Sequence, residues 1–443
     1  MLVISASRMS INNPLKRKCN CTSLHLFQLF IWTLFTFTNC SFIGNHAELT
    51  ENPNHQGYGG ALQLGGTTQS STFTYTVTNC IFESNIADRY GGALSIEAEN
   101  SFRCENCRFV RNEAAEFGGA IYVDPSVSKG NSEITITGCT FEDNDSTGSA
   151  IYCKENGNAN SRMSITGNCQ FKTNTKNDAT FIIARCKSLT ISDITFDMES
   201  LDKTCRAIKI ENPATDLIIQ YVVFRNCAIS SGEGNAIYID SLPTIQGHQP
   251  IQATIENCYF ENCGTIGWAV YSLVSQLKYS NNTITYTSNS KDKGGGGLYA
   301  TGGTIERNTF ENTFKYAEEK GNALTVICTQ ANADLQPFSI NHNVFIKCNG
   351  EYTRCFNISL TKLVDGSQYL ENITIRDCPE ASALTGFIEI FEPNCSGIVF
   401  EKCKWINNSV SGNVGGGGSG LSLKTPDRFE VYFEDNLFEN NIA

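Results

Sequence analysis

The feature that most constrains the fold of this chain is a short unit that recurs along it. The unit reads Cys-x-Phe-x-x-Asn, then a polar gap, then Gly-Gly-Ala followed by Ile or Leu. Complete copies stand at residues 40–62, 80–94 and 107–121. Repeats of a few tens of residues are typical of solenoids, in which each repeat packs on its neighbours. We therefore expect a solenoid and not a compact globular core.

The anchoring residue of the unit can be followed beyond the complete copies. Successive anchors lie between 24 residues (Phe260 to Ile284) and 40 residues (Phe42 to Phe82) apart. No proline-rich linker or long charged block interrupts the series, so we predict one repeat domain over residues 38–443. The anchors are Phe42, Phe82, Phe109, Phe141, Phe171, Phe196, Phe224, Phe260, Ile284, Phe310, Phe345, Ile375, Trp405 and Phe438.

Period-two patterns between the anchors indicate strands. Residues 132–137 and 253–256 contain alternating β-branched residues, and no segment sustains the three- and four-residue apolar spacing of a helix. A coil of about 30 residues per turn, with two or three short strands in each turn, is a parallel β-helix whose rungs stack about 4.8 Å apart. We predict an all-β chain of about 13 such rungs.

Each residue of the unit has a place in this coil. The Phe points inward and stacks on its copies as an aromatic ladder, while Ala and Ile or Leu fill the opposite inner wall. The Gly-Gly pair permits a positive φ at a tight turn, and the Asn three residues after Phe is expected in a left-handed turn. Two residues before the anchor, Cys gives way to an Asn that can bond amide to amide between rungs. These copies are Asn282, Asn308, Asn343 and Asn436.

Charge and cysteine content limit the classes of partner and cofactor. A net charge of −12 and a pI near 5.0 argue against nucleic acid, because no basic stripe is present to neutralise phosphates. The 20 cysteines leave both disulfides and free thiols open. The pairs Cys19 with Cys21 and Cys104 with Cys107 have no second pair at zinc spacing, so neither a metal site nor a cofactor is predicted.

The first 37 residues are predicted to be a signal or anchor segment. Lys16-Arg17-Lys18 precede an apolar run over residues 24–35, which is the order found in secretory signals. The run is short for a transmembrane helix. The run also leads directly into the first copy of the repeat. The alternative is therefore that the run forms a strand of a first, shortened rung. The chain stops inside a half-unit at Ala443, and we expect a truncated repeat there.

The pairing of Phe-x-x-Asn with Gly-Gly-Ala resembles the repeats of the polymorphic outer-membrane protein family of chlamydiae and of similar surface proteins in parasitic protists. Residues 82–85 with 91–94, and 109–112 with 118–121, match both halves of the motif. The resemblance implies a right-handed parallel β-helix, an adhesin role at a cell surface and a protist source. The complete pair is confined to the first third of the chain, and such a repeat defines a scaffold more than an activity.

No catalytic constellation is evident, so we predict no enzyme activity and no catalytic residues. The enzymatic alternative is a polysaccharide lyase, hydrolase or epimerase, which would need paired carboxylates or a basic residue in a groove. The local acid pairs fall in predicted turns or strand exits, where solvated acids are common, and the histidines have no triad or metal spacing. The acid pairs are Asp143 with Asp145, Asp193 with Asp197, and Glu318 with Glu319. The histidines are His25, His46, His55, His248 and His342.

The expected function is that of an extracellular or cell-surface, adhesin-like scaffold. Its long face, with loops at 48–58, 124–132, 240–250 and 286–294, would bind glycans or host or matrix proteins. Binding residues stay unassigned, and membrane contact is expected only through the N-terminal segment or a part beyond the C-terminus. A purely structural spacer predicts the same sequence. Glycan acceptor triplets stand at Asn20, Asn39, Asn144, Asn281, Asn357, Asn372, Asn394 and Asn407.

We predict that Cys80, Cys107, Cys139 and Cys169 are stacked free thiols, because they share one slot of the unit. Cysteines at stacked equivalent positions serve more often as small buried side chains than as bonded pairs. Mass spectrometry after alkylation under non-reducing conditions should find no disulfide among them. A disulfide joining any two of the four would contradict the prediction.

Overall fold

The structure, a computed structural model, consists of β-strands and connecting turns in two compact units, Met1–Ile218 and Ile219–Ala443. The part of the chain that it describes contains no helix, and therefore none long and apolar enough to cross a membrane. The residues described are 3–4, 9–11, 24–25, 34–49, 57–64, 74–97, 101–124, 131–146, 149–154, 160–172, 179–198, 204–211, 216–230, 233–240, 252–264, 267–274, 276–286, 296–313, 321–328, 339–348, 354–360, 368–378, 386–390, 397–409, 421–425 and 430–442.

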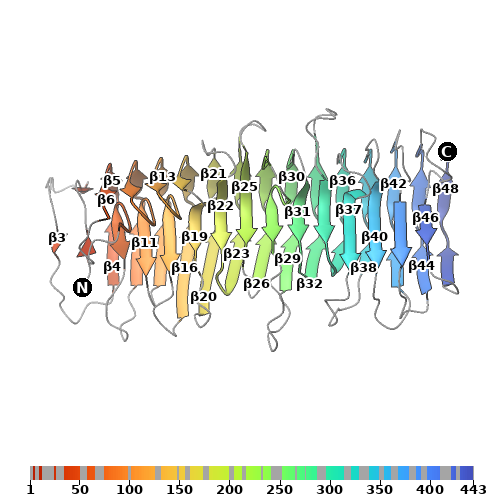
Figure 1. Cartoon of the computed structure of the whole chain (residues 1–443), viewed down its shortest axis with the longest axis horizontal. Helices are drawn as coiled ribbons and strands as arrows, with labels where there is room; N and C mark the ends of the chain where they lie inside the picture. The colour runs from red at the N-terminus through yellow and green to blue at the C-terminus, as the bar shows by residue number, and fades with distance from the viewer. Residues whose placement is uncertain are drawn as a thin grey trace. The chain divides into compact units, whose positions relative to one another are not determined.

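Each rung of the first unit contributes one strand to each of three parallel sheets (Figure 1). We name them by their order in the rung: the entry wall, the aromatic wall that contains the anchor, and the return wall after Gly-Gly-Ala. The entry wall consists of β4 (Leu34–Thr38), β8 (Thr74–Thr78), β12 (Ser101–Glu105), β16 (Asn131–Thr137), β20 (Asn160–Thr166) and β23 (Ser188–Ser192). The aromatic wall consists of β5 (Cys40–Ile43), β9 (Ile81–Glu83), β13 (Arg108–Val110), β17 (Thr140–Glu142), β21 (Gln170–Lys172) and β24 (Thr195–Asp197). The return wall consists of β7 (Leu62–Leu64), β11 (Leu94–Glu97), β15 (Ile121–Asp124), β19 (Ser149–Cys153), β22 (Ala179–Ala184) and β25 (Cys205–Ile210).

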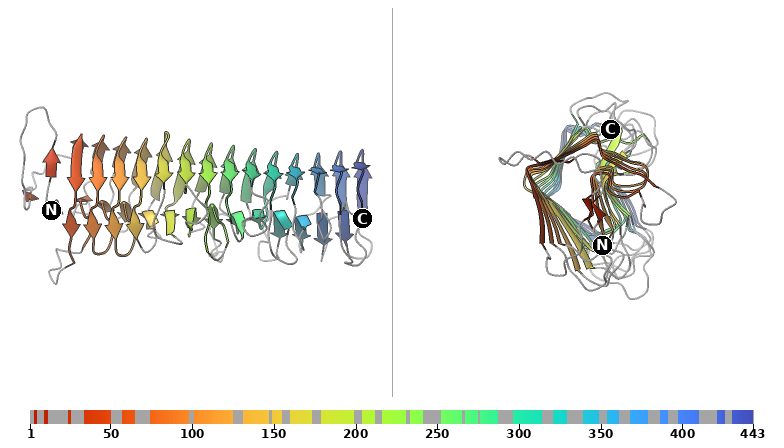
Figure 2. Two further views of the ribbon diagram at one scale, coloured as in Figure 1. Left: turned by 90° about the horizontal axis from the view of Figure 1, so that it is seen from above. Right: turned by 90° about the vertical axis from the view of Figure 1, so that its left-hand side faces the viewer.

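A fourth, short sheet, which we call the ledge, is found in the first unit. It lies in chain order between the aromatic and return walls, and its strands also pair in parallel. The end-on view of Figure 2 shows the strands of this end of the chain lying in front of one another, rung upon rung. The ledge consists of β6 (His46–Ala47), β10 (Ile86–Ala87), β14 (Glu113–Ala114) and β18 (Asp145–Ser146).

The N-terminal segment is described only in part. Residues 12–23 and 26–33, which hold the basic triplet and most of the apolar run, lie outside the described residues. The end of the apolar run forms β4, which pairs in parallel with β8 and so belongs to a rung. Three further strands are antiparallel: β1 (Val3–Ile4) pairs with β3 (Leu24–His25), and β2 (Met9–Ile11) pairs with β5.

The second unit repeats the three walls. β26 (Asp216–Gln220) spans the boundary between the units. The entry wall of the second unit consists of β29 (Gln252–Glu256), β32 (Gln276–Ser280), β35 (Thr304–Glu306), β38 (Ser339–Asn341), β41 (Gln368–Glu371), β44 (Gly397–Glu401) and β47 (Glu430–Glu434). Its aromatic wall consists of β27 (Val223–Arg225), β30 (Tyr259–Glu261), β33 (Thr283–Thr285), β36 (Thr309–Glu311), β39 (Val344–Ile346), β42 (Thr374–Arg376), β45 (Lys404–Ile406) and β48 (Leu437–Glu439). Its return wall consists of β28 (Ile237–Ile239), β31 (Trp268–Ser272), β34 (Gly296–Ala300), β37 (Gly321–Cys328), β40 (Arg354–Leu360), β43 (Gly386–Ile390) and β46 (Leu421–Lys424).

The predicted aromatic ladder is confirmed in the first unit. Phe109, Phe141 and Phe171 are Cα partners in adjacent strands, and all three side chains are buried. The Phe141 ring centroid lies 4.9 Å from that of Phe109 and 4.7 Å from that of Phe171, with the rings within 7° of parallel. The ring spacing equals the distance between adjacent strands of a sheet. In the second unit the same stacking joins Phe224 to Phe260 at 4.7 Å.

Left-handed residues bend the chain on both sides of each anchor strand. Asn79, three residues before Phe82, has a φ of 54°, and Ser84, two residues after it, has a φ of 53°. The same two positions recur along the chain, with Asn or Asp at many of them. These residue types tolerate the left-handed region best after glycine, because their side chains bond the local backbone. Every anchor strand is therefore short, and the walls meet at corners.

The predicted left-handed turn at the Asn three residues after Phe is wrong. Asn85 is fully buried, and the turn lies one residue earlier, at Ser84. The Asn85 amide bridges two rungs: its Nδ2 donates to the Phe42 carbonyl at 3.0 Å and to Asn112 Oδ1 at 2.8 Å. A buried amide without such partners would cost about 1–3 kcal/mol, which explains why the slot keeps the same hydrogen-bonding side chain in the complete copies.

The slot two residues before the anchor forms a second ladder, as predicted. In the second unit Asn308 Nδ2 donates to Asn343 Oδ1 at 3.0 Å, and the backbone N–H of Asn282 donates to Asn308 Oδ1 at 2.9 Å. In the first unit a thiol takes the place of the amide: the N–H of Cys80 donates to Cys107 Sγ at 3.3 Å. Cys and Asn thus exchange in this slot because both accept a hydrogen bond from the neighbouring rung.

The two glycines of Gly-Gly-Ala have different roles. Gly91 has a φ of 69°, which confirms the predicted positive φ for the first glycine. Gly92 has no such φ, but a Cβ on it would lie 2.1 Å from the Gly119 carbonyl oxygen of the next rung. The second glycine therefore permits close approach of two backbones, and any side chain there would force the rungs apart.

We predict that Phe141→Ala destabilises the chain locally. Removal of a buried ring leaves a cavity and costs about 3–5 kcal/mol. In a solenoid, stability is a sum of rung and nearest-neighbour terms, so the damage should centre on the flanking rungs. Hydrogen exchange should become faster around residues 105–180 and stay near wild type around residues 300–400. Uniformly faster exchange along the chain would contradict the prediction.

Candidate functional site

An outward-facing column of aromatic side chains follows the ledge. Tyr58, Tyr90 and Phe117 each stand directly before a Gly-Gly pair, and single parallel bridges join them between rungs. The Tyr90 ring centroid lies 5.1 Å from that of Tyr58 and 6.1 Å from that of Phe117. All three side chains are partly exposed. Large aromatic side chains held at the surface in a row are typical of binding sites, because they offer contact area at a low cost in conformational entropy.

The column is held by a buried layer on the outer face of the return wall. Tyr122 and Tyr152 are Cα partners on β15 and β19, and their side chains are almost fully buried although they point away from the interior of the coil. Tyr90 stacks on Tyr122 and Phe117 stacks on Tyr152, each with 4.5 Å between ring centroids. The ledge therefore folds back over the return wall, and burial of each ring contributes about 1.5–3 kcal/mol. This packing makes the column rigid.

Arg89 ties the column to a carboxylate. Its guanidinium donates to the hydroxyls of Tyr58 and Tyr90 at 3.3 and 3.2 Å and to Glu116 Oε1 at 3.0 Å. It also lies 4.9 Å from the Tyr90 ring centroid, within range of a cation–π contact. A hydrogen bond from the Tyr90 hydroxyl, together with Arg89, lowers the pKa of Glu116. We call Tyr58, Arg89, Tyr90, Glu116 and Phe117 the Tyr–Arg surface.

A hydrogen-bonded His–Asp pair lies beside this surface on the ledge. His46 Nε2 is 2.7 Å from Asp88 Oδ1, and the backbone N–H of Leu49 donates to Asp88 Oδ2 at 2.8 Å. The Leu49 N–H and then His46 lower the pKa of Asp88. Since Asp88 precedes Arg89, the ledge presents both signs of charge along one rung. Charged groups of both signs next to aromatic edges suit a polar ligand with many hydroxyl or amide groups.

Charged side chains also border the buried tyrosines. Tyr122 donates its hydroxyl to Asp124 Oδ2 at 3.2 Å, and Lys154 Nζ lies 3.0 Å from the same carboxylate oxygen. Arg185 lies 5.9 Å from the Tyr152 ring centroid and donates to Glu211 Oε2 at 2.7 Å. These ion pairs are part-exposed, so each contributes about 0–1 kcal/mol to stability.

The second unit carries its own aromatic row on the outer face of its return wall. Tyr238, Tyr271 and Tyr299 are partners in adjacent strands and stack with centroid distances of 5.6 and 4.4 Å. Trp268, which is fully buried, lies 5.0 Å from Tyr299. No short ledge strand accompanies this row among the described residues of the second unit, so the row remains partly exposed without a ledge over it.

The structure describes two of the three acid pairs noted in the sequence. Asp143 occupies a left-handed corner with a φ of 51°, whereas Asp145 lies on the ledge strand β18. Asp193 also occupies a left-handed corner, and Asp197 ends β24. Asp143, Asp193 and Asp197 thus lie at the turns and strand exits that the sequence predicted, whereas Asp145 lies within a strand. Glu318 and Glu319 lie outside the described residues.

His46 and His342 contact different kinds of residue. His46 pairs with Asp88 on the ledge of the first unit, and His342 Nε2 lies 3.2 Å from Asn372 Nδ2 in the second. His55 and His248 lie outside the described residues, as do most residues of the four predicted loops.

Burial divides the predicted glycan acceptors. Asn144 is a buried ladder residue, and Asn357 is 8% exposed, so neither can carry a glycan in the folded chain. Asn39, Asn281 and Asn407 are exposed at left-handed corners. Asn20 and Asn394 lie outside the described residues.

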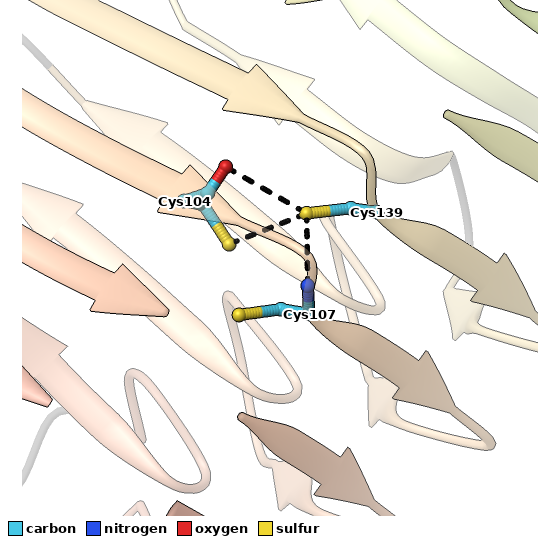
Figure 3. Close-up of side chains that lie close together, drawn as sticks. All are labelled: Cys104, Cys107 and Cys139. Atoms are coloured by element: carbon cyan, nitrogen blue, oxygen red, sulfur yellow. Dashed lines mark hydrogen bonds between the residues drawn. The ribbon is translucent and has the colours of Figure 1, made fainter. Parts of the chain in front are cut away.

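Three buried thiols form the only candidate metal ligand group among the described residues (Figure 3). The Sγ atoms of Cys104, Cys107 and Cys139 all lie within 4.8 Å of one another. Cys104 and Cys107 belong to one rung, and Cys139 comes from the next. Figure 3 shows Cys139 Sγ facing the Cys104 side chain, and these two sulfurs are 3.6 Å apart. Cys107 and Cys139 are free thiols, as the sequence predicted.

Sequence reasoning missed the Tyr–Arg surface and the third thiol for the same reason. Both consist of residues from different rungs, whose contacts depend on register. One signal for the surface was present in the sequence: an aromatic residue precedes each complete Gly-Gly pair, at Tyr58, Tyr90 and Phe117. The signal for the thiols was that Cys107 and Cys139 share one slot while Cys104 lies three residues before Cys107.

Comparison with known protein families supports the fold. The family model described as the right handed beta helix region matches residues 127–314. No curated protein and no solved structure matches the chain. The matched stretch lies in both units, and the same three walls are present before and after it. The predicted all-β, right-handed parallel β-helix solenoid is therefore confirmed, and the chain is a repeat scaffold of this class.

We predict that the Arg89–Glu116 pair stabilises the ledge at neutral pH and not in acid. Because the folded-state pKa of Glu116 is lowered, its contribution is complete above the ordinary glutamate pKa of about 4.3 and is lost as the pH falls through the lowered value. The pair is more than a third exposed, so the effect is small. Hydrogen exchange over residues 86–92 should be faster in Glu116→Gln than in wild type at neutral pH. The difference should vanish in acid, and a difference that persists there would contradict the prediction.

Proposed function

We propose that this chain is a secreted or cell-surface, adhesin-like scaffold that binds a glycan through the Tyr–Arg surface. The observation that carries the proposal is the partly exposed aromatic column, held rigid by buried Tyr122 and Tyr152 and flanked by Arg89 and Glu116. Tyrosine and arginine are the residue types that most often dominate binding energy. The resemblance of the repeat to the polymorphic outer-membrane protein family, with a protist source, supports a surface role.

The chemistry of the surface favours a hydroxyl-rich ligand. The ring of Tyr90 stacks on that of Phe117 and is tilted by 39° to that of Tyr58, so we expect a ligand to meet ring edges and tyrosine hydroxyls. Arg89 and Glu116 add a fixed donor group and a carboxylate acceptor beside those edges. Glycans combine hydroxyl pairs, which such groups bind, with C–H surfaces that pack on aromatic carbon. The net charge of −12 argues against nucleic acid as the ligand.

The exposed aromatic surface of the column supports binding over a role as a spacer alone. A spacer needs the three walls, whereas the ledge and its column add exposed aromatic surface that a spacer does not require. Exposed aromatic side chains are a liability for solubility unless they serve an interaction. Three of the four ledge strands, β6, β10 and β14, lie in the complete copies of the repeat motif, which links the motif of the first third of the chain to this surface.

We expect the purified chain to bind members of a glycan array, and Arg89→Gln to weaken that binding at least about tenfold, or about 1.4 kcal/mol. Arg103→Gln is the matched control, because Arg103 is an exposed arginine on the entry wall, paired only locally with Glu105 at 3.4 Å. Circular dichroism should show both variants folded.

Other outcomes distinguish the alternatives. Release of reducing sugar ends from a bound glycan would favour the polysaccharide-active enzyme. Absence of glycan binding with capture of a purified matrix protein would favour a protein ligand, and absence of both would favour the spacer. Equal loss of binding in Arg89→Gln and Arg103→Gln would remove the Tyr–Arg surface as the site.

A further inference from the structure

The thiol cluster of the first unit brings together side chains from two walls and two rungs. Cys104 lies on β12 with its side chain directed into the coil, and Cys107 follows the left-handed corner at Asn106. Cys139 occupies the slot of Cys107 in the next rung. The corner places the two cysteines of one rung on either side of the bend. In-register stacking then adds the third sulfur above them.

The spacing of the sulfurs matches a trigonal thiolate site. With metal–sulfur bonds of about 2.3 Å, three sulfurs in a plane around one ion are about 4.0 Å apart. Cys104 Sγ and Cys139 Sγ are 3.6 Å apart, and all three sulfur pairs are within 4.8 Å. Rotations of the three side chains that move each sulfur by a few tenths of an ångström would therefore complete the site.

We propose that Cys104, Cys107 and Cys139 bind a single copper(I) ion with three sulfur ligands. Soft thiolates select copper(I) and zinc among the available metals, but zinc in structural sites takes four ligands. All three side chains are buried, at 0–2% exposure, so water does not supply a fourth ligand. Cys80 and Cys169 continue the thiol column on either side, but no further His, Cys, Asp or Glu among the described residues has its ligand atom within 4.8 Å of all three sulfurs. Copper(I) is stable with three sulfur ligands, which is the number present.

The surroundings of the cluster stabilise negative charge on sulfur. The backbone N–H of Cys80 donates to Cys107 Sγ at 3.3 Å, and that of Cys107 donates to Cys139 Sγ at 3.4 Å. Hydrogen bonds to ligand atoms orient them and tune the site. Binding forms three sulfur–copper bonds, releases the thiol protons to solvent and leaves the copper oxidation state unchanged.

Among the described residues of the first unit, the cluster occurs only where Cys104 adds a thiol to the column. The Cα partners of Cys104 in the adjacent rungs are Val77 and Ile136, which carry no ligand atom. Elsewhere in the first unit the slot of Cys107 therefore forms a single column of thiols, as at Cys80 and Cys169. The same comparison supplies a conservative variant, because Cys104→Val inserts a side chain that the adjacent rung already accommodates.

The test uses the full chain, expressed in copper-supplemented medium and purified without oxygen. Copper content is measured by elemental analysis, and X-ray absorption gives the number and type of ligand atoms. Wild type should retain copper with three sulfur ligands, whereas Cys104→Val and Cys139→Asn should retain at least about tenfold less. Asn preserves the acceptor of the ladder, as it does at Asn282 and Asn308. The control is Cys153→Val, another buried thiol of this unit, whose partner in one adjacent rung is Val123.

Each result decides the proposal. Loss of copper in the two cluster variants but not in Cys153→Val, with all three folded by circular dichroism, supports it. Retained copper falling as the pH is lowered also supports it, since protons compete for the sulfurs. Copper-free wild type, equal copper in Cys104→Val and wild type, nitrogen or oxygen ligands in the absorption spectrum, or a Cys104–Cys139 disulfide in the anaerobic protein would each overturn it.

Discussion

Every part of this structure depends on in-register stacking, which places each residue next to its equivalent in the adjacent rung. Stacking fixes what the buried slots must contain, because the neighbour above and below is the same kind of group. A buried backbone N–H at a corner has no acceptor within its own rung, so the side chain of the next rung must accept its hydrogen bond. Asn45 meets Asn85 in this way through Oδ1, and Cys80 meets Cys107 through Sγ. The two ladders are thus solutions to one hydrogen-bonding requirement.

The same constraint explains why the complete repeat motif builds more than a core. An Asn ladder on one side and a Gly-Gly pair on the other hold a short segment between them at fixed height in each rung. In the first unit this segment becomes the ledge, and the residue before Gly-Gly emerges as an aromatic column. Gly92 allows the backbones to approach, so that Tyr90 reaches Tyr122 on the outer face of the return wall. A structural motif and a candidate binding surface therefore share their cause.

Stacking also brings together functional side chains that lie far apart in the sequence. One arginine per several rungs has little effect alone, but Arg89 meets two tyrosines and a glutamate because three rungs converge on it. A pair of cysteines three residues apart becomes a group of three when the next rung supplies Cys139. In both cases the groups are brought together at the rung spacing of about 4.8 Å. Repeat scaffolds can in this way assemble sites without a dedicated loop.

Much of the fold could be predicted from residues alone. The period of the anchors, the β-branched alternation and the Gly-Gly pairs determined a parallel β-helix, because each is a local requirement of a strand, a turn or a stacked core. The positions of the turns were less certain: Asn85 looked like a turn residue, and only the tertiary structure showed it as a buried bridge, since burial depends on which way a corner bends. The candidate site was harder to predict from the sequence than the turns. Tyr90 and Tyr122 lie 32 residues apart in the sequence and in different rungs, and their contact is decided by how far the ledge folds back over the return wall. Local pattern determined the rungs of this protein, whereas register and the angle of each corner decided which side chains meet.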